Sequence, residues 1–86
     1  MPLISEFFGI RIYIFWDDHS PPHFHAEYGD SRILVEIENA VVMKGLFPFR
    51  QLKLVLAWCE LHRPELLADW VAAASHSEIK RIDPLR

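Results

Sequence analysis

Cysteine is nearly absent from this 86-residue chain, which contains only Cys59. A single cysteine excludes an intramolecular disulfide and any cysteine-rich zinc site. Cys59 lies within an apolar stretch with helical spacing, where a free cysteine is most often a small core residue. We therefore predict that its thiol is buried and unreactive.

An excess of basic residues is also missing. Nine lysines and arginines stand against 12 aspartates and glutamates, so the net charge is −3 at pH 7 with histidine neutral. Proteins that bind nucleic acids without sequence preference use a basic excess to neutralise phosphates. We therefore expect no general nucleic-acid binding, and a DNA-binding regulator is disfavoured.

Long apolar runs are missing as well. No run reaches the length of a transmembrane helix. Residues 1–16 are apolar, but they lack the basic segment and the small-residue cleavage site of a signal peptide, and they alternate like a strand. We expect no membrane association and a cytoplasmic location.

The chain is nevertheless rich in apolar side chains. Hydrophobic residues make up 51% of it, with three Trp and six Phe, which is more than a disordered chain contains. A chain this short builds one core, so residues 1–86 are predicted to form a single domain. The apolar content also favours a protein partner or a homo-oligomer that would cover part of the surface.

The first half of the sequence alternates with the period of β-strands. Residues 9–16 are a predicted strand, with Ile10, Ile12, Ile14 and Trp16 on one side. Residues 23–28 and 31–37 form a predicted hairpin around Gly29-Asp30, because glycine readily takes the positive φ of such a turn. This register sets His23 opposite Glu36 and Phe24 opposite Val35.

The predicted hairpin has one apolar and one polar face. The expected core face consists of Phe24, Ala26, Tyr28, Ile33, Val35 and Ile37. The other face consists of His23, His25, Glu27, Arg32, Leu34 and Glu36. A shift by one residue would mix these two sets, so the register is favoured over its neighbours.

The second half has helical spacing. Pro48 is placed to begin one helix and Pro64 to begin a second. A shorter strand is predicted at residues 39–45, and residues 77–86 are a candidate for a short last strand that Pro84 would end. Strands followed by helices predict an α+β fold, namely an antiparallel sheet of three to four strands with two helices packed on one face.

The run DHSPPHFH at residues 18–25 resembles the signature of small bacterial proteins called Domain of Unknown Function 4160. The segments PLISEFFGI, LVLAWCELHRPEL and IDPL are similar to the same family in the same order, so the resemblance covers essentially the whole chain. It implies a short intracellular protein whose gene often lies beside another small open reading frame in a toxin–antitoxin-like pair. It implies no established reaction and assigns no role to the matching residues, which are Asp18, His19, Pro21, Pro22, His23, Phe24 and His25.

Three of the five histidines fall within residues 19–25. The His-x-His spacing places His23 and His25 on one face of a strand, about 6–7 Å apart. The predicted register puts Glu36 beside His23, and His19 could fold back from the Pro-Pro segment. These four residues are therefore candidate ligands of a divalent metal such as zinc.

Two other interpretations of the cluster remain open at this point. The histidines could line a solvated or partner-facing surface, with Asp18 capping a turn. They could instead serve as acid–base catalysts, since histidine titrates near neutral pH. His62 and His76 lie in the helical half and are expected on the other side of the sheet.

The sequence contains no complete catalytic set, so no catalytic residue is assigned and the question of enzymatic activity stays open. Two functions are consistent with these observations. One is an interaction or regulatory module of a toxin–antitoxin-like pair. The alternative is a metal-binding protein, of the type of a metal-dependent hydrolase or a nuclease-type toxin, that uses the histidine cluster.

Overall fold

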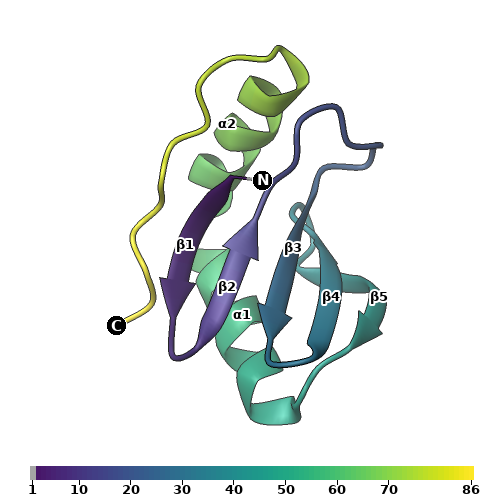
Figure 1. Ribbon diagram of the computed structural model, residues 1–86, viewed down its shortest axis with the longest axis vertical. Helices are drawn as coiled ribbons and strands as arrows, with labels where there is room; N and C mark the ends of the chain where they lie inside the picture. Colours follow the sequence, from purple (N-terminus) through teal and green to yellow (C-terminus); the bar gives the residue numbers. More distant parts are fainter. Residues whose placement is uncertain (1) are drawn as a thin grey trace.

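The computed structural model describes residues 2–86, which adopt an α+β fold (Figure 1). Five strands form one antiparallel sheet in the order β1-β2-β3-β4-β5, so each strand pairs with its neighbours along the chain. The strands are β1 (Leu3–Phe7), β2 (Ile10–Tyr13), β3 (His23–Tyr28), β4 (Ser31–Glu36) and β5 (Val41–Leu46). Two helices follow, α1 (Phe49–Leu61) and α2 (Arg63–Ala74). The predicted fold class is confirmed.

The predicted number of strands, three to four, is wrong, because β1 was not expected. β1 and β2 are joined by a two-residue turn in which Phe8 and Gly9 have φ values of 50° and 78°. Such turns need positive φ at both central residues and usually contain Asn-Gly or Asp-Gly. Phenylalanine in the first position conceals this hairpin in the sequence.

The candidate strand at residues 77–86 does not form. This segment instead runs beside β1 (Figure 1), where the Ile82 N–H donates a hydrogen bond of 2.7 Å to the Ile4 carbonyl oxygen. The side chain of Ile82 is buried in the core. The tail is therefore attached by single contacts and does not extend the ladder of the sheet.

The β3–β4 hairpin has the predicted register at every position. His23 pairs with Glu36, Phe24 with Val35, and so on to Tyr28 with Ser31. Phe24 and Val35 are fully buried, as are most of the side chains predicted for the core face. The alternation of the sequence therefore fixes which face of β3 carries His23 and His25.

The core lies between the inner face of the sheet and the helices, and Trp58 of α1 lies at its centre. The Trp58 ring contacts Phe7 and Phe24, with ring centroids 5.3 and 5.7 Å away, and its Nε1–H donates to the Asp83 carbonyl oxygen. Cys59 is fully buried beside it, as predicted. α2 adds Leu66 and Ala73 to the same core. Among residues 2–86, no helix is both long and apolar enough to cross a membrane.

Candidate functional site: a His–Asp–His cluster

Strand β3 places two imidazole rings side by side on the outer face of the sheet. His23 and His25 are separated by one residue, so both point away from the core, and their ring centroids lie 5.2 Å apart. The His23 side chain is only 4% exposed, because Trp70 of α2 lies over it with ring centroids 5.1 Å apart. The expectation of a solvated face is therefore wrong for His23, which is buried by a helix far away in the sequence.

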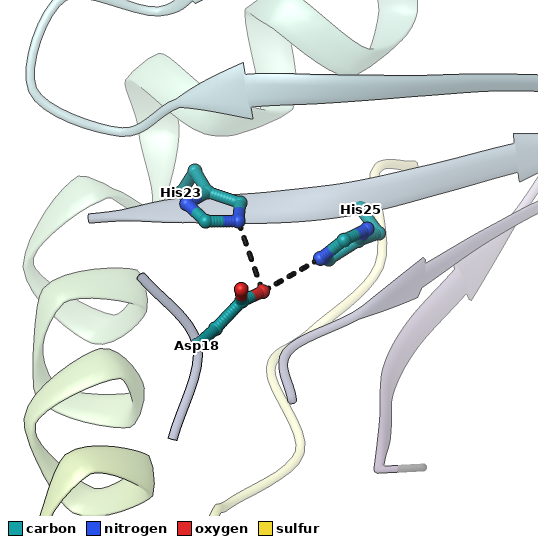
Figure 2. Close-up of side chains that lie close together, drawn as sticks. All are labelled: Asp18, His23 and His25. Carbon is teal, nitrogen blue, oxygen red and sulfur yellow. Dashed lines mark hydrogen bonds and ion pairs between the residues drawn. The ribbon is translucent and has the colours of Figure 1, made fainter. Parts of the chain in front are cut away.

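A carboxylate from the loop before β3 joins these two rings (Figure 2). The Asp18 Oδ2 atom lies 2.9 Å from Nε2 of His23 and 2.9 Å from Nε2 of His25. The second oxygen, Oδ1, accepts a hydrogen bond of 2.9 Å from the backbone N–H of His19. Asp18 therefore accepts a hydrogen bond from its own loop and also completes a His–Asp–His cluster, which we define as Asp18, His23 and His25.

The second ring nitrogen of His23 also faces an acceptor. Its Nδ1 lies 2.9 Å from the carbonyl oxygen of Pro21. A carbonyl oxygen is only an acceptor, so this hydrogen bond requires a proton on Nδ1. A neutral imidazole carries one N–H, so it cannot donate to both Pro21 and Asp18. With Nδ1–H bound to the carbonyl, the Nε2 lone pair faces the Asp18 carboxylate. A second proton or a metal ion between the two groups would satisfy both contacts.

The electrostatics of Asp18 agree with this conclusion. Burial acts to raise the pKa of its carboxyl group. Hydrogen bonds from the His25 side chain and the His19 backbone, together with the charges of His23 and His25, outweigh burial and leave the pKa below its usual value. The anionic form is therefore favoured at the site. A carboxylate is the form that can bind a metal ion.

The three donor atoms also have a suitable spacing for a shared ion. One carboxylate oxygen and two imidazole nitrogens all lie within 4.8 Å of one another. A tetrahedral zinc ion with bonds of 2.0–2.1 Å holds its ligand atoms roughly 3.3 Å apart, so modest side-chain movements would suffice. Asp18 and His25 are 20% and 22% exposed, which leaves one side of the cluster accessible.

The structure separates the other predicted ligands from this cluster. His19 is exposed, and its backbone N–H contacts Asp18. Glu36 pairs with His23 across the strands, but its carboxylate accepts a hydrogen bond of 2.7 Å from the Asn39 amide. Of the four candidate ligands, the structure brings His23 and His25 together and adds Asp18.

The remaining histidines are engaged elsewhere. The Nδ1 atom of His62 lies 2.7 Å from a carboxylate oxygen of Glu65, and Nε2 of His76 lies 3.0 Å from Asp17. Neither belongs to the cluster, although His76 contacts the residue next to Asp18.

An aromatic wall lies next to the cluster on the outer face. The Phe15 ring meets the His25 ring edge to face at a centroid distance of 4.3 Å, and Tyr13 stacks on Phe15 at 6.2 Å. These rings limit the rotation of His25 and shield one side of it from water. The wall therefore helps hold Nε2 of His25 toward Asp18.

Sequence reasoning missed Asp18 as a member of the site. The sequence pattern assigns its carboxylate only a turn-capping role. The same fold-back of the Pro-Pro loop that was considered for His19 brings Asp18 over β3 instead. The signal was its position at the start of the DHSPPHFH run, within reach of both histidines.

Fold and site together define a small α+β protein whose sheet carries a partly buried His–Asp–His cluster on its outer face. A family model described as Domain of unknown function (DUF4160) matches residues 9–71, well over half of the chain. The chain therefore belongs to this family, and the resemblance found in the sequence is confirmed. The matched region includes the whole cluster. The searches of curated proteins and of solved structures found no match.

Proposed function

We propose that the protein binds one divalent metal ion through Oδ2 of Asp18 and Nε2 of His23 and His25. One observation carries this proposal, the hydrogen-bond geometry of His23, whose Nδ1 is held by the Pro21 carbonyl while Nε2 faces the carboxylate. Metal-binding histidines usually donate their other ring N–H to a carbonyl or carboxylate in this way. The Pro21 carbonyl would fix the ring orientation and leave Nε2 free to bind.

The donor set indicates which metals fit. Two imidazoles and one carboxylate suit zinc and other first-row divalent ions, and they do not form the oxygen-rich sites that calcium and magnesium prefer. Three protein ligands leave at least one coordination position for water, as in catalytic rather than structural zinc sites. A metal-dependent hydrolase or a nuclease-type toxin is therefore the enzymatic form of this proposal.

Metal content tests the proposal directly. Untagged protein, dialysed against metal-free buffer after loading with zinc, is expected to retain about one ion per chain by elemental analysis. Asp18→Asn and His25→Ala are expected to lose this ion. His19→Ala and Glu36→Gln, which change two residues outside the cluster, are matched controls and should retain it. Equal zinc content in all five proteins would contradict the proposed ligand set.

A second candidate function is supported by a separate observation. Eight large apolar side chains among residues 2–86 are exposed, and a chain with this much uncovered apolar surface favours a protein partner. We propose an interaction or regulatory module of a toxin–antitoxin-like pair, located in the cytoplasm, where the free thiol of Cys59 would remain reduced. Co-expression with the product of the neighbouring gene, followed by gel filtration at micromolar concentration, should give a complex. Separate elution of the two proteins would contradict this function.

A further inference from the structure

The two edges of the sheet differ in how they are covered. The C-terminal segment lies beside β1, where Ile82 donates to the Ile4 carbonyl, whereas β5 forms the opposite edge and pairs with β4 only, within residues 2–86 (Figure 1). An edge strand presents unpaired backbone N–H and C=O groups to whatever approaches it. The edge of β5 is therefore a template for one more strand.

Exposed apolar side chains gather at this same edge. Four of the eight exposed large apolar residues among residues 2–86 fall within residues 41–49, and Leu46 is 88% exposed. They are Val41, Met43, Leu46 and Phe49. An added strand with apolar side chains at alternate positions would cover part of this group, as in other proteins that bind a peptide by strand addition.

The charged side chains of the segment that contains β5 are all basic, although the chain as a whole is acidic. Residues 39–59 contain no aspartate or glutamate, and they contain Lys44, Arg50 and Lys53. Lys44 belongs to β5 itself and is exposed. Opposite charges on neighbouring strands attract, so an occupant with carboxylates fits this edge.

The same features disfavour a second copy of the chain as the occupant. A second copy would bring its own Lys44 to the shared edge, where like charges on adjacent strands repel. β5 also has a bulge at Met43, because Lys44 pairs with Leu34 while Val42 pairs with Val35. Lysines and bulges are common means by which edge strands limit uncontrolled edge-to-edge pairing, including aggregation of identical chains.

Gly45 holds the edge in this shape. Its φ is +95°, and a Cβ atom at this position would lie 2.1 Å from the Arg32 carbonyl oxygen. Only glycine fits such a close approach to β4, so the bulged path of β5 is built into the chain.

We propose that β5 binds an extended, acidic segment of a different protein, which adds to the sheet as a further strand. Its apolar side chains would cover Val41 and Leu46, and one of its carboxylates would pair with the Lys44 ammonium group. This inference rests on the second proposed function, partner binding, and gives that function a surface and a partner chemistry. It does not require a metal ion in the His–Asp–His cluster.

Two fluorescent peptides test the proposal by anisotropy. One peptide has, at alternate positions that share a face of the strand, a central glutamate flanked by valines, and the other has lysine in place of this glutamate. The intact protein is expected to bind the glutamate peptide about tenfold or more tightly than the lysine peptide. Lys44→Glu should reverse this preference, and Lys44→Gln should abolish it. Lys80→Glu, an exposed lysine of the C-terminal segment, is the matched control and should bind like the parent protein.

Amide hydrogen exchange adds a readout of the position of the peptide. The glutamate peptide should slow exchange in residues 41–46 and leave the tail beside β1 unchanged. Binding of neither peptide, equal binding by the parent protein and Lys44→Glu, or protection elsewhere would overturn the proposal. So would a homodimer on gel filtration that a β5 substitution disrupts, because the occupant would then be a second copy.

Co-expression with the neighbouring gene product distinguishes a failure of β5 as the binding surface from a failure of the proposed partner function. A complex that persists unchanged in Lys44→Glu keeps the partner function and overturns β5 as its surface. Absence of a complex with the parent protein contradicts the partner function itself. Circular dichroism of each variant confirms that it folds before binding is compared.

Discussion

The Asp18 carboxylate and the His23 imidazole lie 2.9 Å apart, and the other nitrogen of the same ring is already engaged by the Pro21 carbonyl. The pKa of the Asp18 carboxyl lies below its usual value, and a neutral His23 ring has only one N–H for these two acceptors. A second proton or a metal ion would satisfy both contacts. Their competition gives the first prediction.

Zinc is expected to raise the melting temperature at about pH 7.5 and to do much less at about pH 5.5, because protonated imidazole nitrogens cannot bind metal. At a hundredfold excess over Kd the stabilisation is about 2.7 kcal/mol. For a domain of this length that corresponds to a rise of about 10 °C or more. Thermal melts followed by circular dichroism, with and without zinc at both pH values, measure this shift.

The variants distinguish the cluster from His19 and Glu36, the two predicted ligands that lie outside it. Asp18→Asn and the double change of His23→Ala with His25→Ala should abolish the zinc-induced rise, whereas His19→Ala and Glu36→Gln should leave it in place. A melting curve that zinc, cobalt, nickel and manganese all fail to shift at about pH 7.5 would leave the cluster as a proton-binding or partner-facing surface.

The hairpin and the two helices were predictable because each is encoded locally. Alternation over residues 23–36 determines two faces, and Gly29 supplies the turn. Pro48 and Pro64 mark where the helices begin. In contrast, Phe8 takes a positive φ that its residue type does not announce, so the first hairpin was missed.

The site was predictable only in part, for a physical reason. His23 and His25 share a face because a strand has a period of two. The position of Asp18 depends on the path of residues 17–22, which have no periodicity, and the burial of His23 depends on Trp70 in a distant helix. Such tertiary contacts leave no local pattern in the sequence.

The two faces of β3 predict different costs of mutation. Phe24 is fully buried against Trp58, so Phe24→Ala is expected to lower the free energy of unfolding by about 3–5 kcal/mol. His25→Ala, on the outer face, should cost within about 1 kcal/mol when a chelator removes divalent ions. Urea denaturation measures both. Equal losses for the two variants would contradict the assignment of the faces.

Cys59 is predicted to react with thiol reagents only in the unfolded chain. The side chain is fully buried, and burial raises the pKa of its thiol despite the opposing charge of Arg63. Reactivity requires an accessible thiolate. In the folded protein the Cys59 sulfur is inaccessible to reagents and its thiol stays protonated. A chromogenic disulfide reagent should therefore report no thiol in native buffer and one thiol in concentrated urea.

A matched control places a thiol at the surface. Ser77→Cys, at an exposed position after α2, should add one thiol that reacts at once in native buffer while Cys59 stays protected. Rapid labelling of Cys59 in the parent protein would mean that the core opens on the timescale of the reaction.

The last prediction concerns Asp69, a carboxylate buried beneath the C-terminal segment. Its side chain is 4% exposed, Oδ1 accepts a hydrogen bond of 2.9 Å from the Lys80 backbone N–H, and Oδ2 is buried without a partner among residues 2–86. Burial raises the pKa of Asp69, and the nearby charge of Glu65 adds to this effect, although the Lys80 hydrogen bond and charge oppose it. The Asp69 carboxyl group therefore stays protonated to a higher pH in the folded state than in the unfolded chain. Between the two pKa values the folded state binds more protons, so the contribution of Asp69 to stability falls as the pH rises from about 4 through the raised pKa.

Asp69→Asn keeps an oxygen for the Lys80 N–H and removes the charge, so it should remove this part of the pH dependence. Urea denaturation of the parent protein, Asp69→Asn and Asp30→Asn, a control at an exposed turn, at several pH values between about 4 and 7 measures the difference. Parallel stability profiles for the parent protein and Asp69→Asn would show that the buried carboxylate is not destabilised by its surroundings.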